Sequence, residues 1–216
     1  MINWKREFSE NAKALWVHDG DRRRPYALLT SGLISNVFFN GGRIASEFPQ
    51  MLSLAAADLA QKARKRLGID ADWRVIGAAK GAITPSYAIA AAGGYRHAWA
   101  DRNGETFVFD RRFAEFFEAG EGFIRAEDTI TTGGTLDRLW QAALAVSPQA
   151  RRAPFVLTIC NRSGKQSLET GESIISLVEL EARVWKEGEN PFTHDGKELT
   201  PPMRPKTHWG ELTRKL

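Results

Sequence analysis

Short apolar segments alternate with longer amphipathic segments through most of the chain, and this alternation limits the possible folds more than any other feature. Runs of apolar, β-branched and aromatic residues predict strands at 73–78, 96–99, 122–126, 155–160 and 174–178. Two intervening segments, 84–92 and 136–146, have the apolar spacing of helices. Strands connected through helices run parallel, and the helices then cover both faces of the sheet. We therefore predict an α/β fold with a mostly parallel, twisted sheet between two layers of helices.

Residues before this region are expected to add smaller elements. Apolar residues at helical spacing predict an amphipathic helix over 3–17. The Ala- and Leu-rich segment that follows Pro49 predicts a helix over 50–67, because proline is favoured in the first helical turn. After the apolar segment 26–29 and a turn at Ser31-Gly32, a short strand is expected at 37–39.

The last 36 residues differ in composition from the rest of the chain. Residues 181–216 contain four prolines and three glycines, which predicts an irregular tail with little regular structure. A chain of 216 residues suits one domain with a sizeable core. We therefore expect one domain over 1–180, with 181–216 packed on it as a tail.

Charge and cysteine content exclude several classes of protein. A net charge of +4 suits an anionic small molecule but is too weak to indicate nucleic acid. The Arg22-Arg23-Arg24 triplet lies beside acidic residues, so we expect a solvated loop there. Cys160 is the sole cysteine, which excludes an internal disulfide and a cysteine metal cluster. Charges within the first seven residues and the absence of long apolar runs lead us to expect a cytoplasmic protein without membrane contact.

One polar segment stands where ligands bind in α/β proteins. Glu127 and Asp128 follow the predicted strand 122–126, at the carboxyl edge of the sheet. A turn rich in threonine and glycine, 131–135, comes next and leads into a helix. Backbone N–H groups, threonine hydroxyls and the helix dipole can bind a phosphate there, while the carboxylates accept hydrogen bonds from sugar hydroxyls. A threonine-capped turn is the simpler alternative, but a cap requires one threonine and leaves the paired acids unexplained.

This segment resembles the phosphoribosyl-pyrophosphate (PRPP) motif of type I phosphoribosyltransferases. The resemblance implies that Asp128 is catalytic and that PRPP contacts Glu127, Asp128, Thr129, Ile130, Thr131, Thr132, Gly133, Gly134 and Thr135. It also implies the type I phosphoribosyltransferase fold, with a small hood made by the N- and C-terminal segments. The family further implies a homodimer and a Mg²⁺ ion held mainly by PRPP, with no metal site made by the protein alone.

Other segments resemble the orotate branch of this family. Gly77–Gly81 is similar to the pyrophosphate loop, which would bring Lys80 and Gly81 to PRPP. Residues 31–40 are similar to the segment that holds the pyrimidine. The resemblance implies base contacts from Ser31, Phe38, Phe39, Thr131 and Arg162. Taken alone, the first two segments are equally well explained as a strand–turn–helix junction and a hairpin with core phenylalanines.

A hairpin is expected between 96–99 and 106–109, because Asn103 and Gly104 both tolerate positive φ. Arg111 and Arg112 follow it and resemble a variant orotate branch, in which arginines replace a lysine-rich flexible catalytic loop. Their guanidinium groups would neutralise the leaving pyrophosphate, which makes both residues catalytic candidates. The alternative is a solvated pair beside nearby acidic residues.

The chain departs from the orotate pattern at several positions. Ile34 stands where a lysine is common, Asn161 replaces an acid, and residues 99–120 contain no lysine. We predict transfer of ribose-5-phosphate from PRPP to a pyrimidine-like base, with orotate as the first candidate. Two alternatives stay open: a phosphoribosyltransferase for another nucleobase, and a non-catalytic nucleotide-sensing or RNA-binding protein on the same fold.

Overall fold

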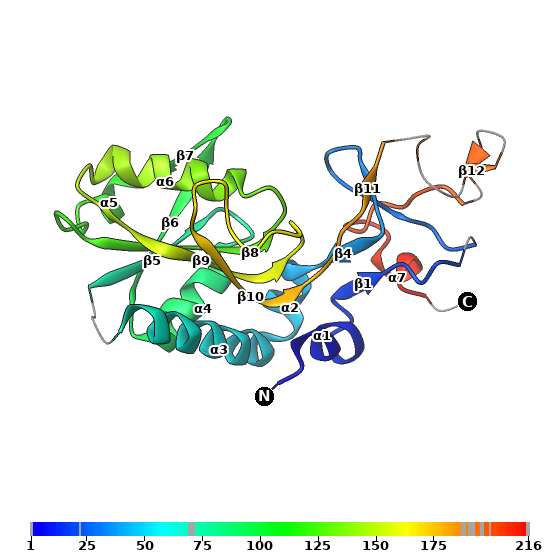
Figure 1. The fold of residues 1–216 in the computed structure, drawn as a ribbon, viewed down its shortest axis with the longest axis horizontal. Coiled ribbons are helices and arrows are strands. Elements are labelled where there is room, and N and C mark those ends of the chain that lie inside the picture. The colour runs from blue at the N-terminus through cyan, green and yellow to red at the C-terminus, as the bar shows by residue number, and fades with distance from the viewer. Residues whose placement is uncertain are drawn as a thin grey trace. The chain divides into compact units, whose positions relative to one another are not determined.

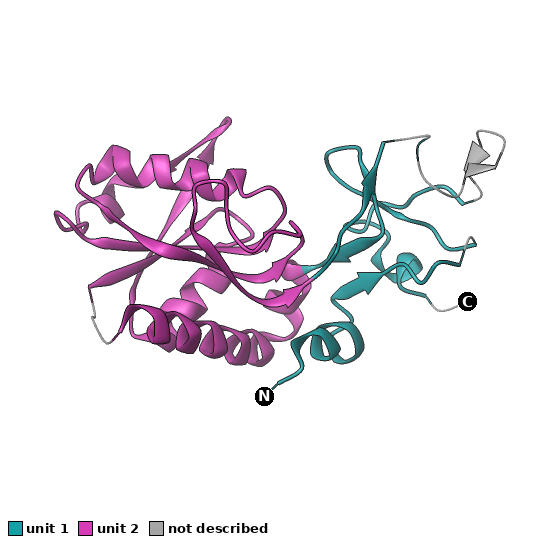
Figure 2. Cartoon of the chain, viewed as in Figure 1, with its two compact units in different colours: residues 1–40, 180–216 teal, residues 41–179 magenta. Residues whose placement is uncertain are grey.

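The computed structural model describes residues 2–21, 23–68, 72–186, 189, 193–194, 197–198 and 200–214. Figure 2 colours the chain by its two compact units. Unit 1 contains residues 1–40 and 180–216, and unit 2 contains residues 41–179. The C-terminal tail thus groups with the N-terminal segment, as a hood made from both ends of the chain requires. The boundary between a domain and a tail near residue 180 stays a prediction.

Unit 2 is built on a six-stranded sheet with the order β10-β9-β8-β5-β6-β7. Its strands are β5 (Trp73–Ala78), β6 (Arg96–Asn103), β7 (Thr106–Phe109), β8 (Gly122–Ile130), β9 (Arg151–Asn161) and β10 (Ser173–Glu179). β7 pairs antiparallel with β6, and every other pair in this sheet is parallel. The α/β fold with a mostly parallel sheet is therefore confirmed.

Helices cover both faces of this sheet, as Figure 1 shows. α3 (Pro49–Leu67) and α4 (Ile83–Gly93) pack against each other on one face, and α6 (Gly134–Val146) lies on the other. All six residues of β5 are buried, because this strand is covered on both sides. Two short helices, α2 (Gly41–Glu47) and α5 (Arg111–Ala114), complete unit 2. Neither helix was predicted from the sequence.

The order of the strands reverses beside β5. After β5 the chain forms α4 and β6 on one side of it, and later returns to place β8 on its other side. Loops that leave the carboxyl ends of β5 and β8 therefore run in opposite directions and leave a crevice where open α/β sheets bind ligands. Residues 79–82 follow β5 and residues 131–133 follow β8, so this topology brings two segments with predicted binding residues to one edge.

Unit 1 is made of short elements. Its helical segments are α1 (Trp4–Arg6), the π-helical turn Glu7–Asn11 and α7 (Trp209–Leu212). β1 (Leu15–Val17) pairs with β4 (Val37–Phe39), and β2 (Ala27–Leu28), β3 (Ile34–Ser35) and β11 (Val184–Trp185) form a second sheet. β12 (Thr193–His194) pairs with β13 (Lys197–Glu198). The described elements of the tail are thus two to four residues long.

The predicted helix over 3–17 is wrong in its second half. The helical turns end at Asn11, and Lys13 has a φ of 48°, which no α-helix accommodates. Leu15 and Trp16 then pair with Phe39 and Phe38 in β1 and β4. Strand pairing with a segment more than 20 residues away overrides the local helical spacing.

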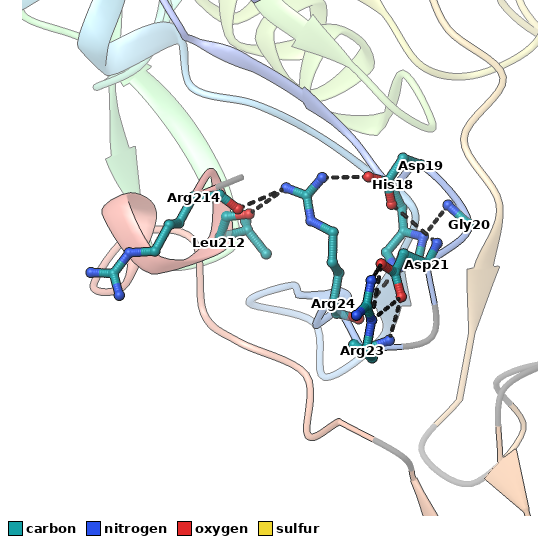
Figure 3. Close-up of polar contacts among 8 residues, drawn as sticks. All are labelled: His18, Asp19, Gly20, Asp21, Arg23, Arg24, Leu212 and Arg214. Carbon is teal, nitrogen blue, oxygen red and sulfur yellow. Dashed lines mark hydrogen bonds and ion pairs between the residues drawn. The ribbon is translucent and has the colours of Figure 1, made fainter. Parts of the chain in front are cut away.

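The arginine-rich loop of unit 1 is tied to the last helix, as Figure 3 shows. Arg24 contacts Asp19 at 2.6 Å and donates to the carbonyl oxygens of Leu212 and Arg214, both at 3.3 Å. Arg23 pairs with Asp21 at 2.7 Å. The prediction of a solvated loop is therefore confirmed for Arg23 and wrong for Arg24, which is largely buried and contacts the last helix. Arg22 lies outside the described residues.

Candidate active site

The two acidic residues of the predicted phosphate-binding segment lie inside a strand rather than after it. β8 extends to Ile130, because its pairing with β9 continues through Glu127 opposite Thr158 and Ile130 opposite Asn161. The predicted end at residue 126 is therefore four residues too early. Since side chains alternate along a strand, Glu127 and Asp128 face opposite sides of the sheet.

The Asp128 carboxylate lies against two glycines. A Cβ atom on Gly41 would stand 2.6 Å from Oδ2 of Asp128, and one on Gly81 would stand 3.3 Å from both carboxylate oxygens. Oδ1 accepts a hydrogen bond from the backbone N–H of Thr129 at 2.8 Å. The carboxylate therefore occupies space that only glycine leaves open, between the start of α2 and the loop after β5.

Glu127 is held on the side of α6. Burial, and after it the negative charge of Asp128, raise the pKa of its carboxyl to about 8, although Thr135 and Arg138 act in the opposite direction. Part of the side chain keeps contact with solvent, yet protein atoms surround the carboxyl closely enough to disfavour its charge. At neutral pH and without ligand, Glu127 is therefore mostly protonated.

We expect the stability of the protein to report this proton. The pKa of Glu127 lies near 8 in the folded chain and near 4.5 in the unfolded chain. Between these pH values the folded chain therefore keeps a proton that the unfolded chain releases. The free energy of unfolding relative to Glu127→Gln should therefore fall by more than about 2 kcal/mol as pH rises from 4.5 to 8. Urea unfolding across this range measures the difference, with the exposed Glu105→Gln as control. Parallel pH profiles for wild type and Glu127→Gln would refute the raised pKa.

The loop after β8 has the geometry of an anion cradle. Gly133 has a φ of 87°, and a Cβ atom there would stand 2.8 Å from Cδ2 of Leu168, so two constraints require glycine. Thr131 and Thr132 are exposed, and α6 begins immediately afterwards at Gly134. The first N–H groups of a helix have no intrahelical acceptors and can bind an anion. Ile130 is fully buried, which leaves only its backbone for a ligand.

The loop after β5 lies at the same edge. Lys80 and Gly81 are exposed, and the Ala79–Lys80 peptide bond is cis, which the sequence does not indicate because no proline follows. Gly81 approaches Asp128 as described above. The structure therefore brings Lys80, Gly81, Asp128 and the loop 131–135 together.

Arg162 follows the end of β9 at this edge. Its backbone N–H donates to the carbonyl of Ile130 at 2.8 Å, and burial lowers the pKa of its guanidinium, which still carries its charge. The preceding Asn161 donates to the carbonyl of Lys165 at 2.8 Å and accepts from the hydroxyl of Ser163 at 2.7 Å. An aspartate could not donate the first of these bonds, so the departure at Asn161 has a local explanation.

Comparison with known proteins agrees with this geometry. No family model matches the chain. It is 28% identical over 193 residues to the orotate phosphoribosyltransferase of Acidithiobacillus ferrooxidans, covering 87% of this chain and 93% of the relative. It is 29% identical over 175 residues to that of Caldicellulosiruptor bescii, covering 81% and 86%. The solved orotate phosphoribosyltransferase of Aeropyrum pernix has a TM-score of 0.61 at 16% identity, covering 83% of this chain and 94% of that one.

Over most of its length the chain is similar to orotate phosphoribosyltransferases, and its fold is that of the type I phosphoribosyltransferases. These relatives are named as phosphoribosyltransferases, which are glycosyltransferases. A solved orotate phosphoribosyltransferase from Mycobacterium tuberculosis has the same fold, with a TM-score of 0.53 at 20% identity, covering 82% and 95% of the two chains.

The structure does not bring the two predicted catalytic arginines to the carboxyl edge. Arg111 and Arg112 are exposed in α5, and Arg112 pairs with Asp110 at 2.7 Å. The chain then runs toward the amino end of β5, where Arg74 donates to the carbonyl of Phe116 at 2.9 Å. Arg102 instead lies near the carboxyl end of β6, two residues beyond the pairing of Ala100 with Ala78. The predicted strand 96–99 ends before Arg102. The hairpin signal at 103–104 could have placed Arg102 in the strand, because a tight turn there requires β6 to continue to residue 103.

Three predicted base-contacting residues belong to unit 1. Phe39 is 4% exposed and packs edge-on against Phe8, with ring centroids 5.4 Å apart. Phe38 points to the other side of β4, is half-buried and lies 5.9 Å from Trp209 between ring centroids. Ser31 is exposed in the turn after β2. Of the two aromatic side chains, Phe38 therefore has the accessible ring.

Metal-binding side chains do not cluster in the described part of the chain. No group of three or more His, Cys, Asp or Glu residues there is arranged to hold a metal ion. Cys160 is fully buried, and burial raises the pKa of its thiol to about 12. Among the described residues, no helix has both the length and the apolar character needed to cross a membrane.

Proposed function

We propose that this chain transfers ribose-5-phosphate from PRPP to a pyrimidine-like base, orotate in the first place, and releases pyrophosphate. The observation that carries this proposal is the meeting of Asp128, Lys80 and the loop 131–135 at the point where the strand order reverses. The names of the relatives support orotate as the acceptor. The family resemblance also leads us to propose a homodimer.

The reaction breaks the bond between the anomeric carbon and pyrophosphate and forms a bond to a ring nitrogen of the base. Positive charge develops on the ribose in the transition state and negative charge on the leaving group, so positioning and charge stabilisation dominate. In our proposal Glu127 and Asp128 accept hydrogen bonds from the ribose hydroxyls. Residues 131–135 bind the 5-phosphate, and Lys80 contacts the pyrophosphate.

Magnesium fits this arrangement as an ion brought by the substrate. Mg²⁺ commonly binds one or two carboxylates together with substrate phosphates and keeps several waters. Asp128 is the carboxylate that could contribute to such a site, because Glu127 faces the other side of the sheet and has a raised pKa. The described residues form no group of three or more metal-binding side chains. The ion would neutralise charge on the leaving pyrophosphate.

Arginines are proposed to complete the pyrophosphate site. Arg111 and Arg112 remain candidates on the resemblance alone. Arg102 has the better position, because β6 ends at the same sheet edge as Lys80. Its Nε donates to the carbonyl of Gly104 at 3.0 Å, which leaves further guanidinium donors for a ligand.

We propose that Phe38, Arg162, Thr131 and Ser31 place the base. Arg162→Ala should raise KM for the base about tenfold or more, because a guanidinium fork suits a planar acceptor, while KM for PRPP changes less than about twofold. Initial rates with each substrate varied separately measure both constants. Equal rises in KM for the base and KM for PRPP would show that Arg162 does not bind the base. Arg151→Ala, at the start of β9, serves as control. Arg138 is not used for this purpose, because its charge acts on Glu127.

A second candidate function is transfer to a different base. It is favoured by Ile34, which is fully buried in β3 and cannot supply the cation common at this position. Purified protein should be incubated with PRPP, magnesium and a panel of bases while pyrophosphate release is followed. Release with orotate supports the first proposal, and release with another base alone supports the second. Binding of PRPP without turnover of any base would contradict both and favour a nucleotide-sensing protein.

A further inference from the structure

Unit 1 contains a hollow of about 810 Å³ that is lined by both ends of the chain. The lining residues lie within 9–17 and 210–214, and all of them belong to unit 1, so the hollow is a property of that unit alone. Sites for small molecules usually measure roughly 300–1,000 Å³, so the hollow has room for a ligand of nucleotide size. None of its lining residues is among those proposed above for PRPP or for the base.

Side chains from each end of the chain bind the backbone of the other end at this hollow. The indole N–H of Trp209, the first residue of α7, donates to the carbonyl of Lys13 at 3.0 Å. In the opposite direction, Arg24 donates to the carbonyl oxygens of Leu212 and Arg214, as Figure 3 shows. The two segments that line the hollow are therefore held against each other.

The turn at Lys13 places a lysine in the lining on an unusual backbone. Lys13 has a φ of 48°, and no other non-glycine residue in the described ranges has a positive φ. Residues with a Cβ atom rarely adopt this conformation, and those that do are concentrated at ligand sites and switch regions. The Lys13 carbonyl accepts the Trp209 hydrogen bond, and the N–H of Ala14 donates to the carbonyl of Phe8 at 2.7 Å. Since glycine fits this backbone better than lysine, the lysine indicates a role for its charge.

The lining carries two positive charges without acidic partners. Lys13 and Arg214 are exposed, and neither forms an ion pair within the described part of the chain. Glu10, the acid of the lining, pairs with Arg6 at 2.9 Å. In Figure 3 the Arg214 side chain extends away from Arg24. Two cations are therefore available for an anionic ligand, and together they match the double negative charge of a phosphate monoester.

A buried side chain of the lining has a donor without an acceptor. Trp16 is 4% exposed and lines the hollow, and its indole N–H has no hydrogen-bond partner among the described residues. Buried N–H groups are nearly always paired, because an unpaired one has lost its bond to water. Leu15 and Val17, the other residues of β1, add apolar surface to the lining. This combination favours a ligand that has an apolar body and a hydrogen-bond acceptor in addition to its charge.

We propose that Lys13, Trp16 and Arg214 form a second binding site, for a phosphate monoester of nucleotide size such as a nucleoside 5′-monophosphate. Lys13 and Arg214 bind the phosphate, and the Trp16 N–H and the apolar residues of β1 contact the body of the ligand. A monocarboxylate is a poorer match, because its single negative charge leaves one cation unpaired. The site goes beyond the proposed function, since it uses other residues and takes a ligand that is neither PRPP nor a base.

Photolabelling of the full-length chain with 8-azidoadenosine 5′-monophosphate tests this site. The probe should label residues within 9–17 or 210–214 in a saturable way, and mass spectrometry of peptides identifies the labelled residues. Adenosine 5′-monophosphate should displace the probe, whereas adenosine, which lacks the phosphate, should displace it about tenfold less well or worse. Labelling confined to other segments of the chain, or equal displacement by the two competitors, would overturn the site.

A matched pair of double variants tests the two charges. Lys13→Met with Arg214→Met should weaken binding of the probe about tenfold or more, because both charge-assisted hydrogen bonds to the phosphate disappear. Arg204→Met with Lys206→Met removes the same two residue types from exposed positions of unit 1 outside this lining, and should leave labelling unchanged. Melting temperatures verify folding, and Arg214→Met alone should give a smaller loss if the variant at Lys13 does not fold. Unchanged binding in the Lys13/Arg214 variant, or an equal loss in the control, would contradict the proposal.

Discussion

Replacing Asp128 with asparagine should lower kcat/KM for PRPP about 100-fold, because two charge-assisted hydrogen bonds to ribose are weakened or lost. The melting temperature should change by less than about 2 °C. The asparagine side chain has the same shape as the aspartate, and its amide oxygen can still accept from the N–H of Thr129. Gly41 and Gly81 leave the same space around the amide. Initial rates and thermal unfolding of the same preparations give both quantities.

The control for this variant is Asp72→Asn. Asp72 is exposed and precedes β5 at the amino edge of the sheet, so it carries the same chemical change away from the candidate site. An Asp128→Asn protein that loses activity only in proportion to lost stability would show that Asp128 is a structural residue. Full activity of the Asp128→Asn protein would show that the charge of Asp128 does not contribute to the use of PRPP.

Replacing Arg125 with methionine should lower the free energy of unfolding by about 3–5 kcal/mol, the usual effect of removing one partner from a buried ion pair. Arg125 is 1% exposed, pairs with Glu172 and donates to the carbonyl of Leu136 at 3.0 Å. Without Arg125, Glu172 keeps one ion-pair partner among the described residues, the partly exposed Arg152 at 3.0 Å, and the Leu136 carbonyl loses a donor. Urea unfolding measures this loss.

A second variant separates pairing from packing at this position. Arg125→Met with Glu172→Met should recover much of the stability, because apolar residues often replace a buried ion pair at little cost. Arg152→Met serves as control and should cost about 1 kcal/mol or less, since its side chain is 34% exposed. A single Arg125→Met variant as stable as wild type would contradict the assigned role of the pair.

The sheet was predictable because its signals are local. Alternating strands and helices define a parallel sheet, and the Glu127–Thr135 segment identifies one edge of it as the place for a ligand. The end of β8 was not predictable, because polar residues at 127–129 are held in the strand by pairing with β9. Likewise, β1 exists through its partner β4, which local spacing cannot show.

The site was predictable only where its residues are close in sequence or belong to family motifs. Lys80, Asp128 and Arg162 lie at one edge, because Lys80 and Arg162 follow the ends of parallel strands and Asp128 precedes the end of another by two residues. The place of Arg102 in β6 was not predicted, because the length of β6 depends on its pairing with β7. The contact of the tail with β2 had no signal at all, since it is made through backbone hydrogen bonds that composition does not encode.

Identification of the products tests most directly whether this chain transfers ribose-5-phosphate. Wild-type protein with PRPP, magnesium and orotate should yield orotidine 5′-phosphate and pyrophosphate in equal amounts by mass spectrometry, and Asp128→Asn should yield about 100-fold less in the same time. Intact PRPP and unchanged orotate after prolonged incubation of a folded, PRPP-binding protein would contradict this claim.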